Sequence, residues 1–245
     1  MMYEPRFYRS WSNAQLGSCQ VSYKETDLLI RSPKLYPDLC MDTIKTLRHR
    51  LDDYLVKHPD FLSSLHPIDI VEEAPEEVRQ MANCASLANV GPMAAVAGMF
   101  AEKVGKVLLE KVDEVIVENG GDIFLAVQQE QVIGVYAGEK SPFSGKIGIR
   151  IAANQTPLGI CTSAGTVGPS LSLGRADAVT VLCRSTPLAD AVATAVGNRI
   201  HCSNDIDAAL KWGQSIRGVT GLLVIKDQKL GVWGELEIVK TKICQ

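Results

Sequence analysis

The stretch at 119–122 reads Asn119-Gly120-Gly121-Asp122. It joins two apolar runs, 112–118 and 122–127, that we predict to be strands. Glycine adopts positive φ without a steric cost, and two bare glycines let a ligand approach the backbone. The turn also places Asp122 at the start of the second strand. Two interpretations stay open, a ligand-binding turn and a tight β-turn with a solvated aspartate.

A second stretch, 189–195, reads Ala189-Asp190-Ala191-Val192-Ala193-Thr194-Ala195. It belongs to a predicted helix at 187–198 that is almost wholly apolar and is therefore expected to be buried. Residues four apart share a helical face, so Asp190 and Thr194 can present two oxygens to one point. A charge in an apolar helix is costly unless it is paired or ligated, and Mg²⁺ prefers oxygen ligands. The alternative is that the N-terminal end of its own helix stabilises Asp190.

A third stretch, 161–168, reads Cys161-Thr162-Ser163-Ala164-Gly165-Thr166-Val167-Gly168 and follows a predicted strand. Its hydroxyls, glycines and backbone N–H groups suit an anion or a phosphate, and a plain surface loop is the alternative. Cys161 would be a nucleophile only with a lowered pKa, and no histidine stands near it in the sequence. We therefore favour a buried structural thiol.

The composition is that of a globular protein and excludes several functions. The 245 residues are 46% hydrophobic and 22% charged, with a net charge of −3, and no linker divides them, so we predict one domain over 1–245. Nucleic-acid binding is not expected because no basic cluster is present. No signal peptide and no membrane-spanning apolar run is visible, and the seven cysteines are odd in number, so we expect a cytoplasmic protein with reduced thiols. The four histidines lack zinc-site spacing.

Strands and helices alternate without a regular βαβ period, which favours a mixed α/β sheet over a Rossmann fold. The predicted helices are 37–57, 75–87, 92–110, 187–198 and 204–214. The predicted strands are 112–118, 122–127, 132–137, 147–152, 158–161 and 178–183, with hairpins at 19–32 and 219–239. Residues 58–75 contain three prolines and are expected to be an extended connection.

Three ordered motifs resemble those of ApbE, the FAD:protein FMN transferase. They are Val117–Ile123, Ala178–Val181 and Ala189–Ala195. The chain is similar over nearly its whole length to a smaller branch of ApbE-like proteins. That similarity includes the segments at 25–28, 90–98 and 161–165.

The resemblance implies an ApbE-type, T-fold-related α/β fold. It would be a single domain with mixed or antiparallel sheets and a buried central helix. In the transferase, a helix aspartate and a threonine four residues later bind Mg²⁺ together with a backbone carbonyl. Asp190 and Thr194 match the first two, and the carbonyl falls near Ala94. The resemblance thus implies Mg²⁺, with the diphosphate of FAD lying on it.

Two departures from the transferase bear on the chemistry. Gly91 and Ala97 stand where the transferase carries an acidic residue and a lysine that hold FAD. Residues 168–174 read Gly-Pro-Ser-Leu-Ser-Leu-Gly where the transferase has His-Ile-Ile-Asp-Pro. The resemblance therefore predicts that the metal-binding residues are retained, whereas the residues that hold FAD and the catalytic histidine are absent.

We therefore expect a cytoplasmic ApbE-like protein with a metal-braced, glycine-lined pocket for FAD or another phosphate-bearing small molecule. It would be a transferase or hydrolase with altered catalytic residues. The expected ligand-binding residues are Asn119, Gly120, Gly121, Asp122, Thr162, Ser163 and Gly165. The alternative is a non-catalytic accessory factor, because ApbE-like relatives in anaerobic prokaryotes are tied to sulfide assimilation into homocysteine. That alternative would give Cys161 a sulfur-handling role. A homodimer packed across the small-residue helix from Pro92 is a third expectation.

Overall fold

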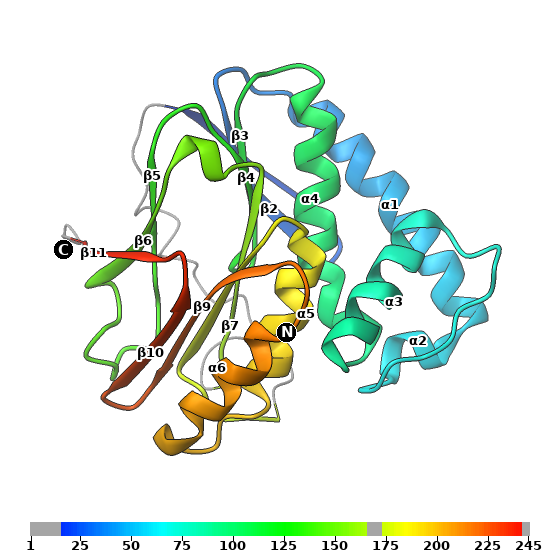
Figure 1. The fold of residues 1–245 in the computed structure, drawn as a ribbon. Coiled ribbons are helices and arrows are strands. Elements are labelled where there is room, and N and C mark those ends of the chain that lie inside the picture. Colours follow the sequence, from blue (N-terminus) through cyan, green and yellow to red (C-terminus); the bar gives the residue numbers. More distant parts are fainter. Residues whose placement is uncertain (1–15, 166–172, 242–245) are drawn as a thin grey trace.

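The computed structural model describes residues 16–165 and 173–241. Within these residues the strands form one eight-stranded and one three-stranded sheet, both antiparallel throughout (Figure 1). In spatial order the large sheet contains β1 (Gly17–Tyr23), β2 (Thr26–Ser32), β3 (Val115–Asn119), β4 (Asp122–Ala126), β7 (Leu158–Ser163), β8 (Ala178–Cys183), β9 (Val219–Lys226) and β10 (Lys229–Gly234). The small sheet contains β11 (Glu237–Lys240), β6 (Ile147–Ile151) and β5 (Gln131–Gly134).

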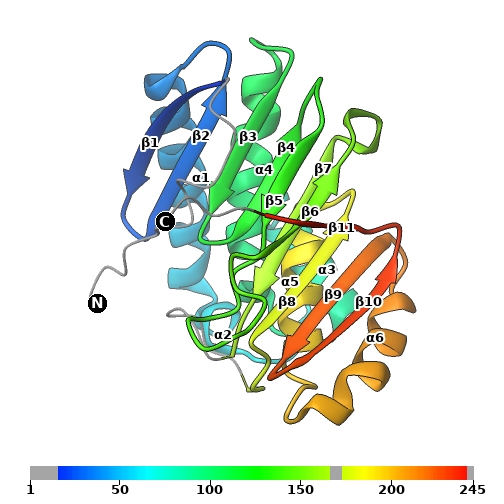
Figure 2. The ribbon, with the colours of Figure 1, turned by 90° about the vertical axis from the view of Figure 1, so that its left-hand side faces the viewer.

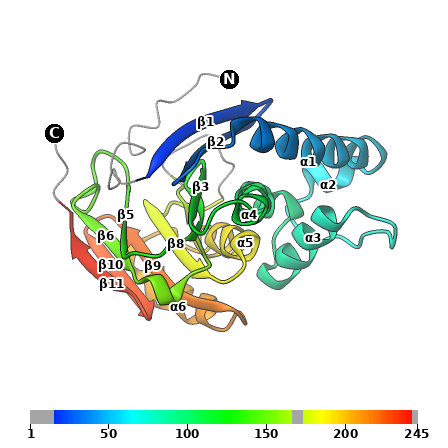
Figure 3. The ribbon, with the colours of Figure 1, turned by 90° about the horizontal axis from the view of Figure 1, so that it is seen from above.

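The helices lie on one face of the large sheet, and the small sheet covers the other face (Figures 2 and 3). The helices are α1 (Pro37–Lys57), α2 (Pro59–Ser63), α3 (Glu76–Ala88), α4 (Val96–Leu109), α5 (Thr186–Gly197) and α6 (Ile206–Gln214). Three 3₁₀ turns, η2 (Pro92–Ala95), η3 (Ala153–Gln155) and η4 (Ser203–Asp205), complete the described elements.

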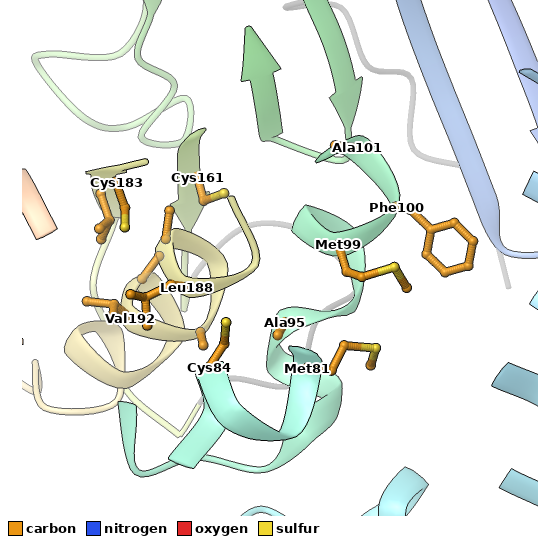
Figure 4. Packing of buried hydrophobic residues seen from close by; sticks show 14 of the residues in the cluster. Met81, Cys84, Ala95, Met99, Phe100, Ala101, Cys161, Cys183, Leu188 and Val192 are labelled. Carbon is orange, nitrogen blue, oxygen red and sulfur yellow. The ribbon is translucent and has the colours of Figure 1, made fainter. Parts of the chain in front are cut away.

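Side chains alternate between the two faces of the large sheet, so each strand contributes to two cores. In β3, Val115 and Val117 pack in the core beneath the helices, whereas Ile116 packs between the two sheets. The larger core holds most of the buried apolar side chains, and part of it is shown in Figure 4. Hydrophobic burial on both faces therefore holds three layers together.

Helix α4 is the predicted buried central helix. It contacts β3 and β4 on one side and α1, α3 and α5 on the others. Gly98, Met99 and Ala101 are buried inside the chain itself. Ala94 and Ala97, at the start of the same segment, are partly exposed. The homodimer expected across the small-residue helix from Pro92 therefore stays a prediction for light scattering.

The structure confirms a mixed α+β fold and corrects two predicted segments. The connection at 58–75 contains the helix α2, because Pro59 starts a short helix that buries Phe61. The last predicted strand breaks at Gly234, whose φ is +91° and where a Cβ would lie 2.2 Å from the Thr220 carbonyl oxygen. The chain turns there, and β11 pairs with β6 in the small sheet.

Among the residues that the structure describes, no single helix is long and apolar enough to span a membrane. Helix α3 and the segment Pro92–Leu109 pass that test only together, as a pair bent by 104°.

Candidate functional site

The glycine turn forms the tip of the β3–β4 hairpin. Gly120 and Gly121 have φ of +67° and +104°, as their sequence predicts, and Asn119 pairs with Asp122 across the turn. The Asn119 side-chain amide donates a hydrogen bond of 3.1 Å to the Ala97 carbonyl at the start of α4. Asp122 is only 8% exposed, so the interpretation as a solvated aspartate is wrong. The turn thus ties the edge of the hairpin to the first turn of α4.

Asp190 lies half-buried on α5, and its carboxylate reaches the first turn of α4. Asp190 Oδ2 accepts a 2.9 Å hydrogen bond from the Gly98 N–H. Removal from water raises the pKa of Asp190 to about 7, against the hydrogen bonds from the Gly98 and Ala97 N–H groups, which lower it. The first N–H groups of a helix have no partner inside the helix. Asp190 therefore caps α4, and not its own helix.

Helix α5 has one narrow polar face. Asp190 and Thr194 are its two half-buried positions, four residues apart, while its other residues are buried, and the half-buried Asn198 follows four residues later at the end of the helix. Thr194 thus shares the face of Asp190, as the spacing predicts. The Asn198 side-chain oxygen accepts a 2.9 Å hydrogen bond from the Leu173 N–H at the far end of this face.

A second buried carboxylate, which is not among the residues expected from the sequence, links the same two helices. Glu102 on α4 is 2% exposed, and its Oε2 accepts a 2.6 Å hydrogen bond from the Thr186 N–H, the first residue of α5. Its Oε1 accepts a 2.6 Å hydrogen bond from the Lys106 ammonium. The signal in the sequence is an acid followed four residues later by a lysine in an apolar helix.

Cys161 lies fully buried beside the start of α5 (Figure 4). Its thiol donates a 3.3 Å hydrogen bond to the Thr186 carbonyl oxygen. Burial raises the pKa of this thiol well above its usual value, and the charges of Asp122 and Asp190 raise it further. The thiol therefore stays protonated at neutral pH, which agrees with a structural role and gives a sulfur-handling role no support.

The hydroxyl-rich segment begins as strand, not as loop, because β7 continues to Ser163. Strand alternation sends the Thr162 side chain to the face of the small sheet, where its Oγ1 lies 2.9 Å from Thr180 Oγ1. Ser163 faces the helices, and a Cβ on Gly197 would lie 3.8 Å from its Oγ. Of the two hydroxyls, only that of Ser163 is directed toward α5.

Gly165 lies against the C-terminal end of α5 through a second glycine. Its N–H donates a 2.8 Å hydrogen bond to the Ala176 carbonyl. A Cβ on Gly165 would lie 2.3 Å from the Gly174 oxygen, and a Cβ on Gly174 would lie 1.9 Å from the Gly197 oxygen. The rest of the predicted phosphate loop, Thr166 to Gly168, lies outside the described residues.

Ala94 lies in η2, which directly precedes α4 and contacts α5. The neighbouring Gly91 is required by the packing, because a Cβ there would lie 1.8 Å from the Ser64 carbonyl oxygen. No acidic side chain fits at this position. The departure from the transferase at Gly91 is thus built into the fold.

The candidate metal donors on α5 and η2, two elements in contact, are oxygens. They are the Asp190 carboxylate, the Thr194 hydroxyl on the same face, and backbone carbonyls of the η2 turn. Mg²⁺ is commonly held by one or two carboxylates together with water and substrate phosphates, and this donor set fits it. In the described ranges, this site included, no three His, Cys, Asp or Glu side chains are grouped to hold a metal, so a cation here would take most of its ligands from hydroxyl, carbonyl and water oxygens. A surface hollow of about 560 Å³ lies along the small sheet, and no candidate residue lines it.

A family model described as "AbpE bacteria" matches residues 9–235. The chain belongs to this family. Relatives include UPF0280 proteins of Methanocaldococcus jannaschii, 41% identical over 91% of this chain and 93% of that one, and of Methanocella arvoryzae, 39% identical over 90% of each.

Solved structures with the same fold include flavin transferases. The Pseudomonas stutzeri flavinyl transferase ApbE superimposes with a TM-score of 0.58 over 93% of this chain and 95% of that one, at 12% identity. The flavin transferase ApbE from Vibrio cholerae gives 0.56 over 90% and 97%, at 14% identity. These values establish the ApbE fold for this member of the AbpE bacteria family.

Proposed function

We propose that this protein binds a phosphate-bearing small molecule, with FAD or another nucleotide as the leading candidate, through Mg²⁺ held by Asp190 and Thr194. The observation that carries the proposal is the position of the Asp190 carboxylate. It is partly buried on an otherwise buried helix, beside the start of α4, on the same face as Thr194. Strongly perturbed carboxylates of this kind are concentrated at functional sites.

The residues around Asp190 have distinct tasks in this proposal. The Asn119–Asp122 turn and Ser163 would border the ligand on the sheet side, with bare glycine backbone to approach. The N-terminal end of α4 carries a partial positive charge that favours a phosphate nearby. When bound, Mg²⁺ would neutralise charge on a diphosphate. The carbonyl near Ala94 would complete the protein ligands.

The fold shared with two flavin transferases supports a flavin nucleotide as the ligand. Gly91 leaves no room for a side chain, which supports contacts to the flavin that differ from those in the two flavin transferases. Mass spectrometry after incubation with FAD and Mg²⁺ distinguishes binding from reaction. Intact FAD indicates a binding protein, and release of FMN and AMP indicates cleavage of the diphosphate.

Calorimetry with FAD in the presence and absence of Mg²⁺ tests the site. The wild type is expected to bind FAD in a Mg²⁺-dependent manner, and Asp190→Ala is expected to lose that dependence because it removes the charged ligand. Asp207→Ala is the matched control, since Asp207 is an exposed carboxylate on α6. Equal binding by the wild type and Asp190→Ala would remove the proposed site.

The pKa of Asp190 predicts how cation affinity depends on pH. Because the metal binds the ionised carboxylate, a proton competes with it below the pKa, which is about 7. The affinity for Mn²⁺, used as a paramagnetic probe for Mg²⁺, is expected to fall about tenfold per pH unit below this value and to level off above it. Electron paramagnetic resonance of free Mn²⁺ measures this. An affinity that is flat from about pH 5.5 to 8 would contradict it.

A further inference from the structure

We infer that Glu102 is the positioning residue of this site, because it fixes the start of α5 and thereby delivers Asp190 to α4. The geometric part of this inference stands on its own. Only its consequence for cation binding rests on the proposed function.

Helices α4 and α5 lack caps of their own and exchange carboxylates instead. The N-cap residue of α4 is Ala95, and that of α5 is Ser185, and neither makes a side-chain cap hydrogen bond. Glu102 of α4 accepts the Thr186 N–H at the start of α5, and Asp190 of α5 accepts the Gly98 N–H at the start of α4. Each helix therefore depends on the other for its capping acceptor.

The two hydrogen bonds close a ring made of one turn from each helix. Gly98 and Glu102 are four residues apart on α4, as are Thr186 and Asp190 on α5, a rise of about 6 Å in each helix. The pairs run in opposite order, so the helices are antiparallel here. A helical turn is stiff, so holding Thr186 in place also fixes Asp190.

The first residue of α5 is held by both of its backbone polar groups. The Thr186 N–H donates to Glu102, and the Thr186 carbonyl accepts the Cys161 thiol from β7. The helix start is thereby fixed against both α4 and the sheet. This gives the buried Cys161 thiol a structural task that needs no reactivity.

The two carboxylate oxygens of Glu102 have different partners, so its capping hydrogen bond can be tested separately from its ion pair. Glu102 Oε1 accepts hydrogen bonds from Lys106 Nζ at 2.6 Å and from Gln80 Nε2 at 3.3 Å. The hydrogen bond from the Thr186 N–H goes to the other oxygen, Oε2. Lys106 is largely exposed. Lys106→Met thus removes the ion pair and leaves the capping bond, which makes it the matched control.

The test follows the amide resonance of Gly98 by nuclear magnetic resonance, with Asp190→Ala as the reference for loss of its carboxylate partner. In Glu102→Ala, this resonance is expected to move toward its position in Asp190→Ala, and Mn²⁺ affinity is expected to fall at least tenfold. Glu102→Gln retains a carbonyl acceptor for Thr186 and is expected to keep the wild-type resonance. Lys106→Met is expected to keep it as well.

A Gly98 resonance that stays at its wild-type position in Glu102→Ala would overturn the inference, even if the variant melts earlier. Loss of stability alone would not move this signal. Should Glu102→Ala fail to fold, Glu102→Asp withdraws the carboxylate by one methylene, and an unmoved resonance there has the same meaning. If the wild type binds no Mn²⁺, the proposed function fails, and the Gly98 resonance still decides the positioning role.

Discussion

Gly98→Ala is expected to lower the free energy of unfolding by about 2 kcal/mol, although alanine is the better helix former by about 1 kcal/mol. The added Cβ would lie 2.6 Å from the Thr186 carbonyl oxygen and 3.0 Å from the Asp190 Cβ. The first of these is a backbone atom and cannot rotate away, so α4 and α5 must separate. That separation also stretches the hydrogen bond from Gly98 to Asp190, and Mn²⁺ affinity is expected to fall with it.

Gly197→Ala is the matched control, because Gly197 is a helical glycine as well, but its Cβ would face the sheet and not another helix. Its Cβ would meet only Ser163 Oγ at 3.8 Å and Val179 Cγ2 at 3.9 Å, which is ordinary contact. We expect its stability to equal or slightly exceed that of the wild type. Urea denaturation measures both variants, with the midpoint compared at constant slope. A Gly98→Ala midpoint at or above that of the wild type would contradict the close approach of the two helices.

Local features of the fold were predictable from the sequence because short-range chemistry determines them. The turn at Asn119–Asp122 requires positive φ at two glycines, and the helix at 37–57 has both an apolar period and a proline at its start. The strand at 158–161 was predicted two residues short. That difference matters, because in a strand consecutive side chains face opposite sides, and Thr162 and Ser163 are therefore separated.

The partners of the site residues were not predictable, because they are distant in the chain. Spacing alone placed Asp190 and Thr194 on one face, which the structure bears out. It gave no hint that Asp190 caps α4, since Gly98 lies 92 residues away. The bond from Thr186 to Glu102 spans 84 residues. Contacts between residues so far apart in the chain depend on how the layers pack. The periodicity of a single segment therefore cannot predict them.

Asp190→Asn is expected to raise the free energy of unfolding of the metal-free protein by about 2–4 kcal/mol at pH 8, and to have little effect near pH 4. The folded-state pKa of Asp190, about 7, is above its ordinary value of 3.8. Its contribution to stability is therefore fully present below about pH 4 and is lost as the pH rises through about 7. Asparagine keeps an oxygen for the Gly98 N–H and does not ionise, so the variant escapes this loss.

Urea denaturation of both proteins at several pH values isolates Asp190, because the other titrating groups are common to both. The difference between the two stability curves is expected to grow from about pH 4 to 8, and parallel curves would contradict a raised pKa. Saturating Mg²⁺ is expected to stabilise the wild type at pH 8, by about 2.7 kcal/mol at a hundred times the dissociation constant, and to leave the variant unchanged. A carboxylate that destabilises the metal-free fold is better explained by ligand binding than by folding.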